Sequence, residues 1–406
     1  MARTAADLPK GTRITDYISL GVVTKVVPLD RITASLTATG TLSVRQRDLP
    51  AHVVVYYVIA LALYMQVSSR EVLRCLFEGL QWLLGPGATV HIAGKSGISQ
   101  ARTRLGWEPV QRLYVDLARP LAVAQTKGAW YRPWRLVTLD GSTLDVADTT
   151  ANVAAFGRPG ASRGTSAYPQ IRLVALVENG THVLFGSEMR GTATGETTLA
   201  RAVVRALQPQ MLCLADRGFF GFELWTQAHA TGADLLWRIK KNLDLPCQAL
   251  LPDGSYLSMI YPSRADRRHQ TKGLRVRVID YQLADVPDAE PRYRLLTTIL
   301  DPAVAPAAEL AALYHERWEI ETAFAELKTH LRGAQIVLRS KTPDLVRQEF
   351  YGLLLAHFAV RALMHEAALS VAEDPDRLSF VHAVRVIRRK LPRFVAIPPS
   401  GPRRLS

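Results

Sequence analysis

One segment, residues 312–331, constrains this chain more than any other, because it combines a clear helical pattern with four reactive side chains. It contains no proline or glycine and many helix-forming residues, which predicts a single α-helix. At about 100° per residue, four side chains share a stripe roughly 60° wide: Tyr314, Arg317, Glu321 and Lys328. Large apolar residues fill the neighbouring arc, so the stripe borders a buried face. The same geometry predicts that Glu326 points elsewhere.

The chemistry of this stripe suits a site at the edge of a cleft. A carboxylate beside an arginine and a lysine can hold a metal ion next to phosphate groups. The alternative is an amphipathic helix whose charges form ordinary ion pairs. Other parts of the chain favour the first interpretation, because they supply two aspartates where partner carboxylates are needed.

Composition limits the class of protein. The chain has 406 residues, of which 48% are hydrophobic, so we expect a globular protein of two or three domains. Its formal charge of +14 favours a polyanionic partner, nucleic acid rather than a membrane. The three cysteines form no zinc spacing and no disulfide framework, which fits a reducing cytosol. The apolar run at residues 52–67 is too short for a membrane span and predicts a buried helix.

The N-terminal region, residues 1–125, has a helical pattern from about Leu49 onward. Ser68 and Glu71 form a capping box, and Gly85 ends the helix that it opens. Gly94-Lys95-Ser96 is not a phosphate loop, because Thr89 stands where that motif needs glycine. We expect instead a short helix–turn–helix that contacts DNA. Its candidate DNA-binding residues are Lys95, Arg102 and Arg104. The alternative is a solvated basic face.

The pattern changes to alternating strands and helices at Trp130. It predicts a strand ending at Asp140, a hairpin with a type I′ turn at Asn179-Gly180, a helix, a strand ending at Asp216, a helix and a strand. This order is that of the ribonuclease H-like α/β fold, a mixed sheet. We therefore expect a helical DNA-binding region at 1–125, a catalytic domain at 126–241 and 301–380, a β-rich insertion at 242–300 and a basic tail at 381–406.

Two aspartates follow strands that lie side by side in this topology. Asp140 and Asp216 would then reach one divalent ion, and Glu321 would arrive from the helix after the insertion. Three such acids could hold two Mg²⁺ ions for an in-line phosphoryl transfer. Each aspartate could instead be an ordinary turn residue before glycine. Asp145 and Asp148 compete with Asp140 as ligands.

The spacing Tyr314-x2-Arg317-x3-Glu321-x6-Lys328 resembles the YREK signature of a large group of bacterial insertion-sequence transposases. LDGS around Asp140 and ADRGF around Asp216 are similar to the two aspartate motifs of that group. The resemblance implies a DDE transposase with Asp140, Asp216 and Glu321 as catalytic metal ligands. It also implies that Tyr314, Arg317 and Lys328 contact DNA near the scissile phosphate.

Further expectations follow from this resemblance. Tyr293 takes the place nearest to an aromatic residue that stacks on a flipped base in well-described members, although those members have tryptophan there. The enzyme would bind terminal inverted repeats and target DNA, use Mg²⁺ with Mn²⁺ as a substitute, and act as a homodimer on DNA. We expect it in the bacterial cytoplasm, associated with the nucleoid and with no membrane. The alternatives are a metal-dependent endonuclease on the same fold and a non-enzymatic DNA-binding protein derived from a transposase.

Overall fold

A computed structural model describes residues 18–19, 21–43, 49–84, 94–161, 164–165, 168–240, 242–282, 292–333, 336–390 and 396–397. The chain divides into two compact units, which are described separately. Unit 1 comprises Met1–Arg119, Leu144–Gln170 and Phe324–Ser406, and unit 2 comprises Pro120–Thr143 and Ile171–Ala323. These units cut across the four parts expected from the sequence, and that four-part division stays a prediction.

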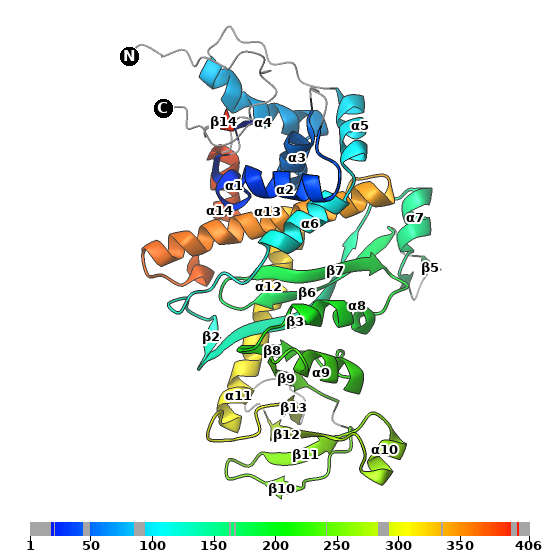
Figure 1. The fold of residues 1–406 in the computed structure, drawn as a ribbon, viewed down its shortest axis with the longest axis vertical. Helices are drawn as coiled ribbons and strands as arrows, with labels where there is room; N and C mark the ends of the chain where they lie inside the picture. The colour runs from blue at the N-terminus through cyan, green and yellow to red at the C-terminus, as the bar shows by residue number, and fades with distance from the viewer. Residues whose placement is uncertain are drawn as a thin grey trace. The chain divides into compact units, whose positions relative to one another are not determined.

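Unit 2 is built on a ten-stranded mixed sheet (Figure 1). The strands lie in the order β10-β11-β12-β13-β9-β8-β3-β6-β7, with β2 beside β3. Their bounds are β2 Trp130–Tyr131, β3 Trp134–Asp145, β6 Gln170–Glu178, β7 Val183–Gly191, β8 Met211–Ala215, β9 Asp234–Arg238, β10 Ala249–Leu250, β11 Tyr256–Ile260, β12 Leu274–Tyr281 and β13 Tyr293–Thr297. The run β7-β6-β3-β8-β9 has the predicted ribonuclease H-like order, with the first and fourth strands adjacent and parallel.

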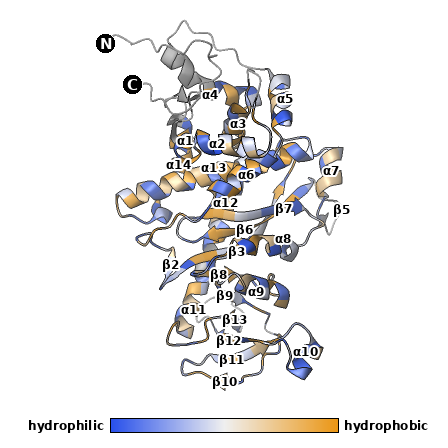
Figure 2. Ribbon diagram, viewed as in Figure 1, coloured by the Kyte–Doolittle hydropathy of each residue, from blue (hydrophilic) through white to orange (hydrophobic). Residues whose placement is uncertain are grey.

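Alternation along the strands divides the core of unit 2 between the two faces of the sheet. Val137 and Leu139 of β3 pack in a cluster with α8 (Glu196–Val203) and α9 (Phe222–His229). Trp134 and Leu136 of the same strand pack in a second cluster, with α11 (Ala307–Tyr314). Hydrophobic residues accordingly concentrate on the central strands (Figure 2). Helices therefore cover both faces of the sheet. α11 packs on β3 and β8 on the face opposite α8 and α9.

The predicted β-rich insertion continues this sheet and does not form a separate one. Strand β13 pairs antiparallel with β9, and the helix α10 (Arg264–His269) connects β11 to β12. Inside the insertion, the fully buried guanidinium of Arg277 pairs with Asp253 and donates to the Ala305 carbonyl at 2.7 Å. Asp253 also accepts the amide of Ala307, the first residue of α11, at 2.8 Å. The insertion thus anchors the start of α11.

The predicted hairpin between β6 and β7 is present, but its turn spans four residues, Asn179–His182, and is not a two-residue type I′ turn. Polar side chains explain the wider turn. Asn179 accepts a hydrogen bond from the Thr138 hydroxyl at 2.8 Å, and the Gly180 amide donates to Glu319 at 2.5 Å. Gly180 has φ +76°, where glycine is favoured.

Residues 312–331 do not form the single α-helix that the sequence predicts. α11 ends at Tyr314, a 3₁₀ turn covers His315–Trp318, α12 covers Glu319–Ala325, and a π-helical turn covers Glu326–Leu331. Tighter and wider turns change the rotation per residue, so one helical wheel cannot describe the segment. Glu326 lies in the π-helical turn, where it is buried and accepts Arg361 Nε at 2.8 Å.

Unit 1 is helical and packs around α3 (Ala51–Leu63) and α13 (Pro343–Ser370) (Figure 1). Its other helices are α1 Gly21–Val26, α2 Leu29–Ala38, α4 Ser69–Leu84, α5 Lys95–Leu105, α6 Glu108–Leu117, α7 Thr150–Phe156 and α14 Phe380–Lys390. Short strand pairs join β1 (Ile18–Ser19) to β14 (Ala396–Ile397) and β4 (Gly160–Ala161) to β5 (Gly164–Thr165). α3 is buried along its length, as the apolar run predicts.

Two further features of unit 1 bear on the sequence predictions. The Ser68 hydroxyl accepts the Glu71 amide at 3.2 Å, which confirms that Ser68 caps α4. α13 is long and apolar enough to cross a membrane by length and composition alone, but 72% of its most apolar window is buried inside the protein. It is thus typical of the core helix of a folded domain.

The contact between α3 and α13 generates a stability prediction. A Cβ added at Gly352 would lie 2.5 Å from Val58 Cγ1 and 2.8 Å from the Val58 carbonyl oxygen, which cannot move without the helix. Gly352→Ala should therefore lower the free energy of unfolding by about 1–3 kcal/mol, measured by urea denaturation. The control is Gly94→Ser, because nothing lies within 4 Å of the Cβ there and serine favours a helix N-cap. Equal stability of the two variants would contradict this packing.

Candidate active site

The two candidate aspartates are placed by the pairing of β3 with β8. These strands are parallel, and their last paired residues are Leu139 and Ala215. Asp140 and Asp216 each follow directly, so they leave adjacent strands at the same level. One detail of the prediction is wrong, because β3 continues to Asp145 and Asp140 lies within it. Of the two strands, only β8 ends at the level of the aspartates, because it stops before Asp216.

The two acids that compete with Asp140 are engaged elsewhere, within unit 1. Asp145 accepts a hydrogen bond from Gln170 Nε2 at 2.7 Å. Asp148 pairs with Arg158 at 2.6 Å. These contacts favour Asp140 over either neighbour as the partner of Asp216.

Arg317 connects Asp140 to Glu321. Its Nη1 donates to Asp140 Oδ2 at 3.2 Å, and its Nη2 lies 3.7 Å from Glu321 Oε1. The Arg317 side chain is only 15% exposed, whereas that of Glu321 is 56% exposed. One guanidinium therefore brings the acid from β3 and the acid from α12 into the same site.

Tyr314 is buried beneath the site. Its hydroxyl donates to the carbonyl of Ala215, the residue before Asp216, at 3.2 Å. Burial is the main reason that the pKa of its phenol is raised, and the nearby Asp216 raises it further. The phenol therefore stays neutral and supports the end of β8, which differs from the predicted contact with DNA.

Asp140 lies in an unfavourable environment for a negative charge. Burial raises the pKa of its carboxyl group, and the charges of Asp216 and Glu196 raise it further. The Gly141 amide, which donates to Asp140 Oδ1 at 2.7 Å, and the cation of Arg317 oppose this shift without cancelling it. The pKa is raised overall mainly because the effect of burial exceeds these two opposing contacts.

Glu196 is a further acid near this site that was not predicted from the sequence. Glu196 begins α8, and its Oε1 lies 3.0 Å from where a Cβ at Gly141 would be. It also lies 3.8 Å from Arg172 Nε. The sequence carries little signal for this contact, since an acidic residue in the first turn of a helix is common for reasons of helix electrostatics alone.

Lys328 belongs to unit 1 and is described within that unit. It lies in the π-helical turn, half-buried, where burial and the charge of Arg332 lower the pKa of its ammonium group and Asp145 opposes the shift. Glu326 of the same turn contacts Arg361 and His357, whose Nε2 is 3.2 Å from Glu326 Oε2.

The predicted helix–turn–helix is present as α5 and α6, but its three basic candidates differ. Lys95 and Arg104 are exposed. Arg102 is buried: its Nε donates to Gln348 at 2.8 Å and its Nη2 to Ser340 at 3.0 Å. The guanidinium of Arg102 is thus occupied in holding α5 to α13, and the structure gives no support for a DNA contact there.

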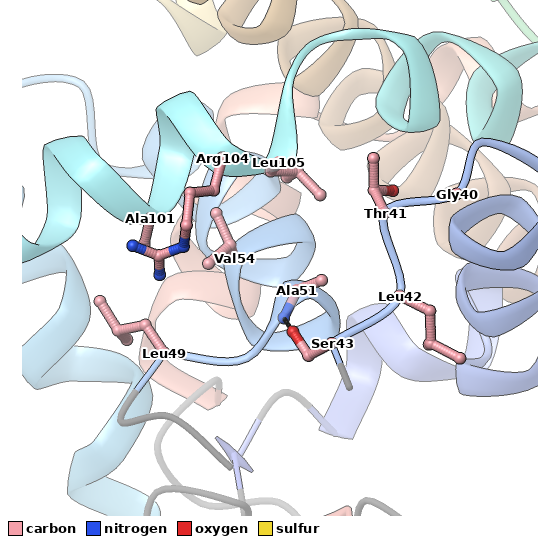
Figure 3. Close-up of a pocket in the computed structure, with 10 residues that line it drawn as sticks. All are labelled: Gly40, Thr41, Leu42, Ser43, Leu49, Ala51, Val54, Ala101, Arg104 and Leu105. Carbon is pink, nitrogen blue, oxygen red and sulfur yellow. Dashed lines mark hydrogen bonds between the residues drawn. The ribbon is translucent and has the colours of Figure 1, made fainter. Parts of the chain in front are cut away.

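Arg104 lines a cavity of about 380 Å³ in unit 1 (Figure 3). The other lining residues come from the connection between α2 and α3, from the start of α3 and from α5: Gly40, Thr41, Leu42, Ser43, Leu49, Ala51, Val54, Ala101 and Leu105. Ser43 and Leu49 flank positions 44–48, which lie outside the described residues. The lining of the cavity is therefore incompletely described, and we assign no ligand to it.

Tyr293 lies at the start of β13 in a packed arrangement. Its ring stacks on Tyr281 at 5.3 Å between centroids, and the guanidinium of Arg238 lies 4.6 Å from its ring centroid. The flanking residues Arg292 and Arg294 both pair with Asp280. These contacts fit a packing role at least as well as the predicted stacking on a base.

The electrostatics of Asp140 generate a prediction. Since its pKa is higher in the folded than in the unfolded chain, its stabilising contribution is present at acid pH and is lost as the pH rises. Asp140→Asn should therefore raise the melting temperature at pH 7.5 in EDTA, and the gain should shrink toward pH 4. Differential scanning calorimetry at both pH values measures this.

Asp253→Asn is the matched control, with the opposite sign. Burial raises the pKa of Asp253, but hydrogen bonds from Ser255 and Ala307 and the charge of Arg277 outweigh that effect and lower it. The contribution of Asp253 to the stability of the fold is thus present at neutral pH and is lost in acid. The variant also leaves buried Arg277 without its carboxylate, which adds to the loss of stability at neutral pH. A fall in melting temperature for both variants would mean that Asp140 stabilises the fold.

Comparisons with known proteins identify the family of this chain. The model of the insertion element 4 transposase N-terminal region matches residues 17–115, and that of the transposase DDE domain matches residues 133–359. The chain is 30% identical over 363 residues to the transposase InsG for insertion sequence element IS4 of Escherichia coli (strain K12), spanning 89% of this chain and 80% of that protein.

Among solved structures, the piggyBac transposase synaptic complex with hairpin DNA aligns over 91% of this chain and 77% of that chain, with 12% identity and a TM-score of 0.46. A score below 0.5 does not by itself establish a common fold. The two family models and the InsG match do establish the relationship: the chain belongs to the IS4 family of insertion-sequence transposases, with a DDE domain that cleaves DNA and transfers strands.

Proposed function

We propose that Asp140, Asp216 and Glu321 are the three metal-binding acids of this transposase, in the YREK subgroup. The observation that supports this most is the register of β3 and β8, which ends at Leu139 and Ala215 and presents both aspartates together. Arg317 adds Glu321 to the pair through its two contacts.

The donor set fits two divalent ions, Mg²⁺ with Mn²⁺ as a substitute. All three groups are carboxylates, the hard oxygen ligands that these ions prefer. Asp140 and Glu321 both lie against the guanidinium of Arg317, so these acids already share one cation. The chemistry that bound Mg²⁺ supplies in such sites is activation of the attacking oxygen and stabilisation of the leaving oxygen.

The protein's own residues prepare this site. The Gly141 amide orients the Asp140 carboxylate through Oδ1. Tyr314 holds the Ala215 carbonyl, and through it the backbone that carries Asp216. We propose that Arg317 and Lys328 bind phosphate groups of the DNA near the cleavage point, where their positive charges also lower the cost of the developing negative charge.

We propose terminal inverted repeats and target DNA as the substrates, with a homodimer as the assembly on DNA. Exposed Lys95 and Arg104 on α5 are the proposed contacts of the N-terminal helices, consistent with the positive formal charge of the chain. Tyr293 remains a candidate for base stacking. The proposed location is the bacterial cytoplasm, on the nucleoid.

Loss of charge at the three acids should abolish cleavage. Asp140→Asn, Asp216→Asn and Glu321→Gln keep the size of each side chain but lose the charge that holds the metal. We expect cleavage of a labelled inverted-repeat end to fall by at least about 10³-fold, in line with the loss of a metal-dependent step. End binding should be retained. Near wild-type cleavage by any one variant would remove that residue from the site.

Removal of a phosphate contact should change the salt dependence of DNA binding. For Arg104→Ala we expect weaker binding and a slope of log K against log salt that is smaller by about one unit. The control is Arg74→Ala, because Arg74 is exposed in the same unit but already pairs with Glu71 at 2.6 Å. Fluorescence anisotropy at several salt concentrations gives both slopes, and equal slopes for the two variants would exclude an Arg104–phosphate contact.

A further inference from the structure

Arg317 contacts the same carboxylate oxygens that the proposed metal site requires. Its Nη1 donates to Asp140 Oδ2 at 3.2 Å. The other oxygen of Asp140, Oδ1, already accepts the Gly141 amide, so Oδ2 is the oxygen that the guanidinium faces. The contact with Glu321 Oε1 at 3.7 Å completes a bridge between the two acids. A metal ion and this guanidinium therefore meet the same side chains.

The backbone around Arg317 is fixed on both sides. Tyr314, three residues earlier, is bonded to the Ala215 carbonyl at 3.2 Å. Glu319, two residues later, accepts the Gly180 amide at 2.5 Å. Between them lies the 3₁₀ turn His315–Trp318, which carries Arg317. A change in the position of the guanidinium is consequently a movement of its own long side chain.

The Arg317 side chain is held mainly by these two acids. Its Nε has no hydrogen-bond partner among the residues that the structure describes, although it is buried. Burial is the main cause of the raised pKa of Asp140, and the nearby charges of Asp216 and Glu196 add to it. Either a guanidinium or a divalent ion at this point can pair with these acids.

We propose that Arg317 is a positioning residue that competes with the divalent ion for Asp140 and Glu321, and that it releases them when a DNA phosphate takes its guanidinium. The inference rests on the proposed function, because it assumes that these acids bind metal. It differs from a simple DNA contact in one respect. A DNA contact remote from the acids has no effect on metal affinity when DNA is absent, whereas a cation held against the acids lowers that affinity.

The test is a titration of the full-length, DNA-free protein with Mn²⁺ at pH 7.5, with free Mn²⁺ measured by electron paramagnetic resonance. A unit charge about 6 Å from a divalent ion in water changes its affinity by about tenfold. We therefore expect Arg317→Met to bind Mn²⁺ about tenfold more tightly than the wild type, and Arg317→Lys to stay close to the wild type because it retains the charge.

Arg294→Met is the matched control. Arg294 lies in the same unit, its side chain is 10% exposed and it pairs with Asp280 at 2.8 Å, away from the three acids. Its removal should leave Mn²⁺ affinity unchanged. If Arg317→Met does not fold, as judged by near-ultraviolet circular dichroism, Arg317→Gln carries the same expectation.

Unchanged, weaker or undetectable Mn²⁺ binding by the folded Arg317→Met or Arg317→Gln variant would overturn the inference. Asp140→Asn in the same titration separates this failure from that of the proposed function. If Asp140→Asn loses Mn²⁺ while Arg317→Met matches the wild type, the metal site stands and the competition does not. If Asp140→Asn binds Mn²⁺ as the wild type does, the assignment of Asp140 as a ligand is wrong. The proposed competition between Arg317 and the metal ion for Asp140 is then wrong as well.

Discussion

The parallel pairing of β3 with β8 is the constraint on which the rest of the site depends. Its register ends at Leu139 and Ala215, and this single fact places two aspartates from distant parts of the sequence next to each other. Packing on both faces keeps the pair of strands in place, since Val137 and Leu139 face one core cluster while Leu136 faces the other. The third acid does not come from the sheet and depends on how α11 and α12 dock against it.

The docking of α11 links the insertion to the chemistry. Buried Arg277 and Asp253 anchor the start of α11, and Tyr314 anchors its end to the Ala215 carbonyl. An insertion between the second aspartate and Glu321 could have loosened the site, but here it extends the sheet through β9 and β13. The same arrangement places Asp216 and Glu196 near Asp140, whose pKa is raised mainly by burial.

Much of the fold could be predicted from the sequence, because strand periodicity and turn residues are local signals. The strand that ends before Asp216, the hairpin near Gly180 and the buried helix at Ala51–Leu63 all follow from such patterns. The proximity of Asp140 and Asp216 could also be predicted, since the strand order alone makes the first and fourth strands neighbours. Glu321 was indicated by its place in the helical stripe with Arg317 and Lys328, and the resemblance to a known family gave it the same role.

The remaining features depend on contacts between distant residues. One helical wheel does not describe residues 312–331, because a 3₁₀ turn and a π-helical turn interrupt the α-helix and no propensity indicates them. Arg102 was a reasonable DNA contact by charge alone, yet Gln348 and Ser340 engage it in the interior. Glu196 was missed because its proximity to Gly141 exists only in three dimensions.

The central claim is that the three acids bind metal directly, and a change of metal preference tests it best. Replacing Asp216 with cysteine substitutes a softer ligand, which Mg²⁺ tolerates poorly and Mn²⁺ accepts better. Cleavage of an inverted-repeat end by Asp216→Cys should be absent with Mg²⁺ and partly restored with Mn²⁺, while Asp216→Ser stays inactive with both. Equal activity of Asp216→Cys in the two metals, or no restoration by Mn²⁺, would contradict direct coordination at Asp216.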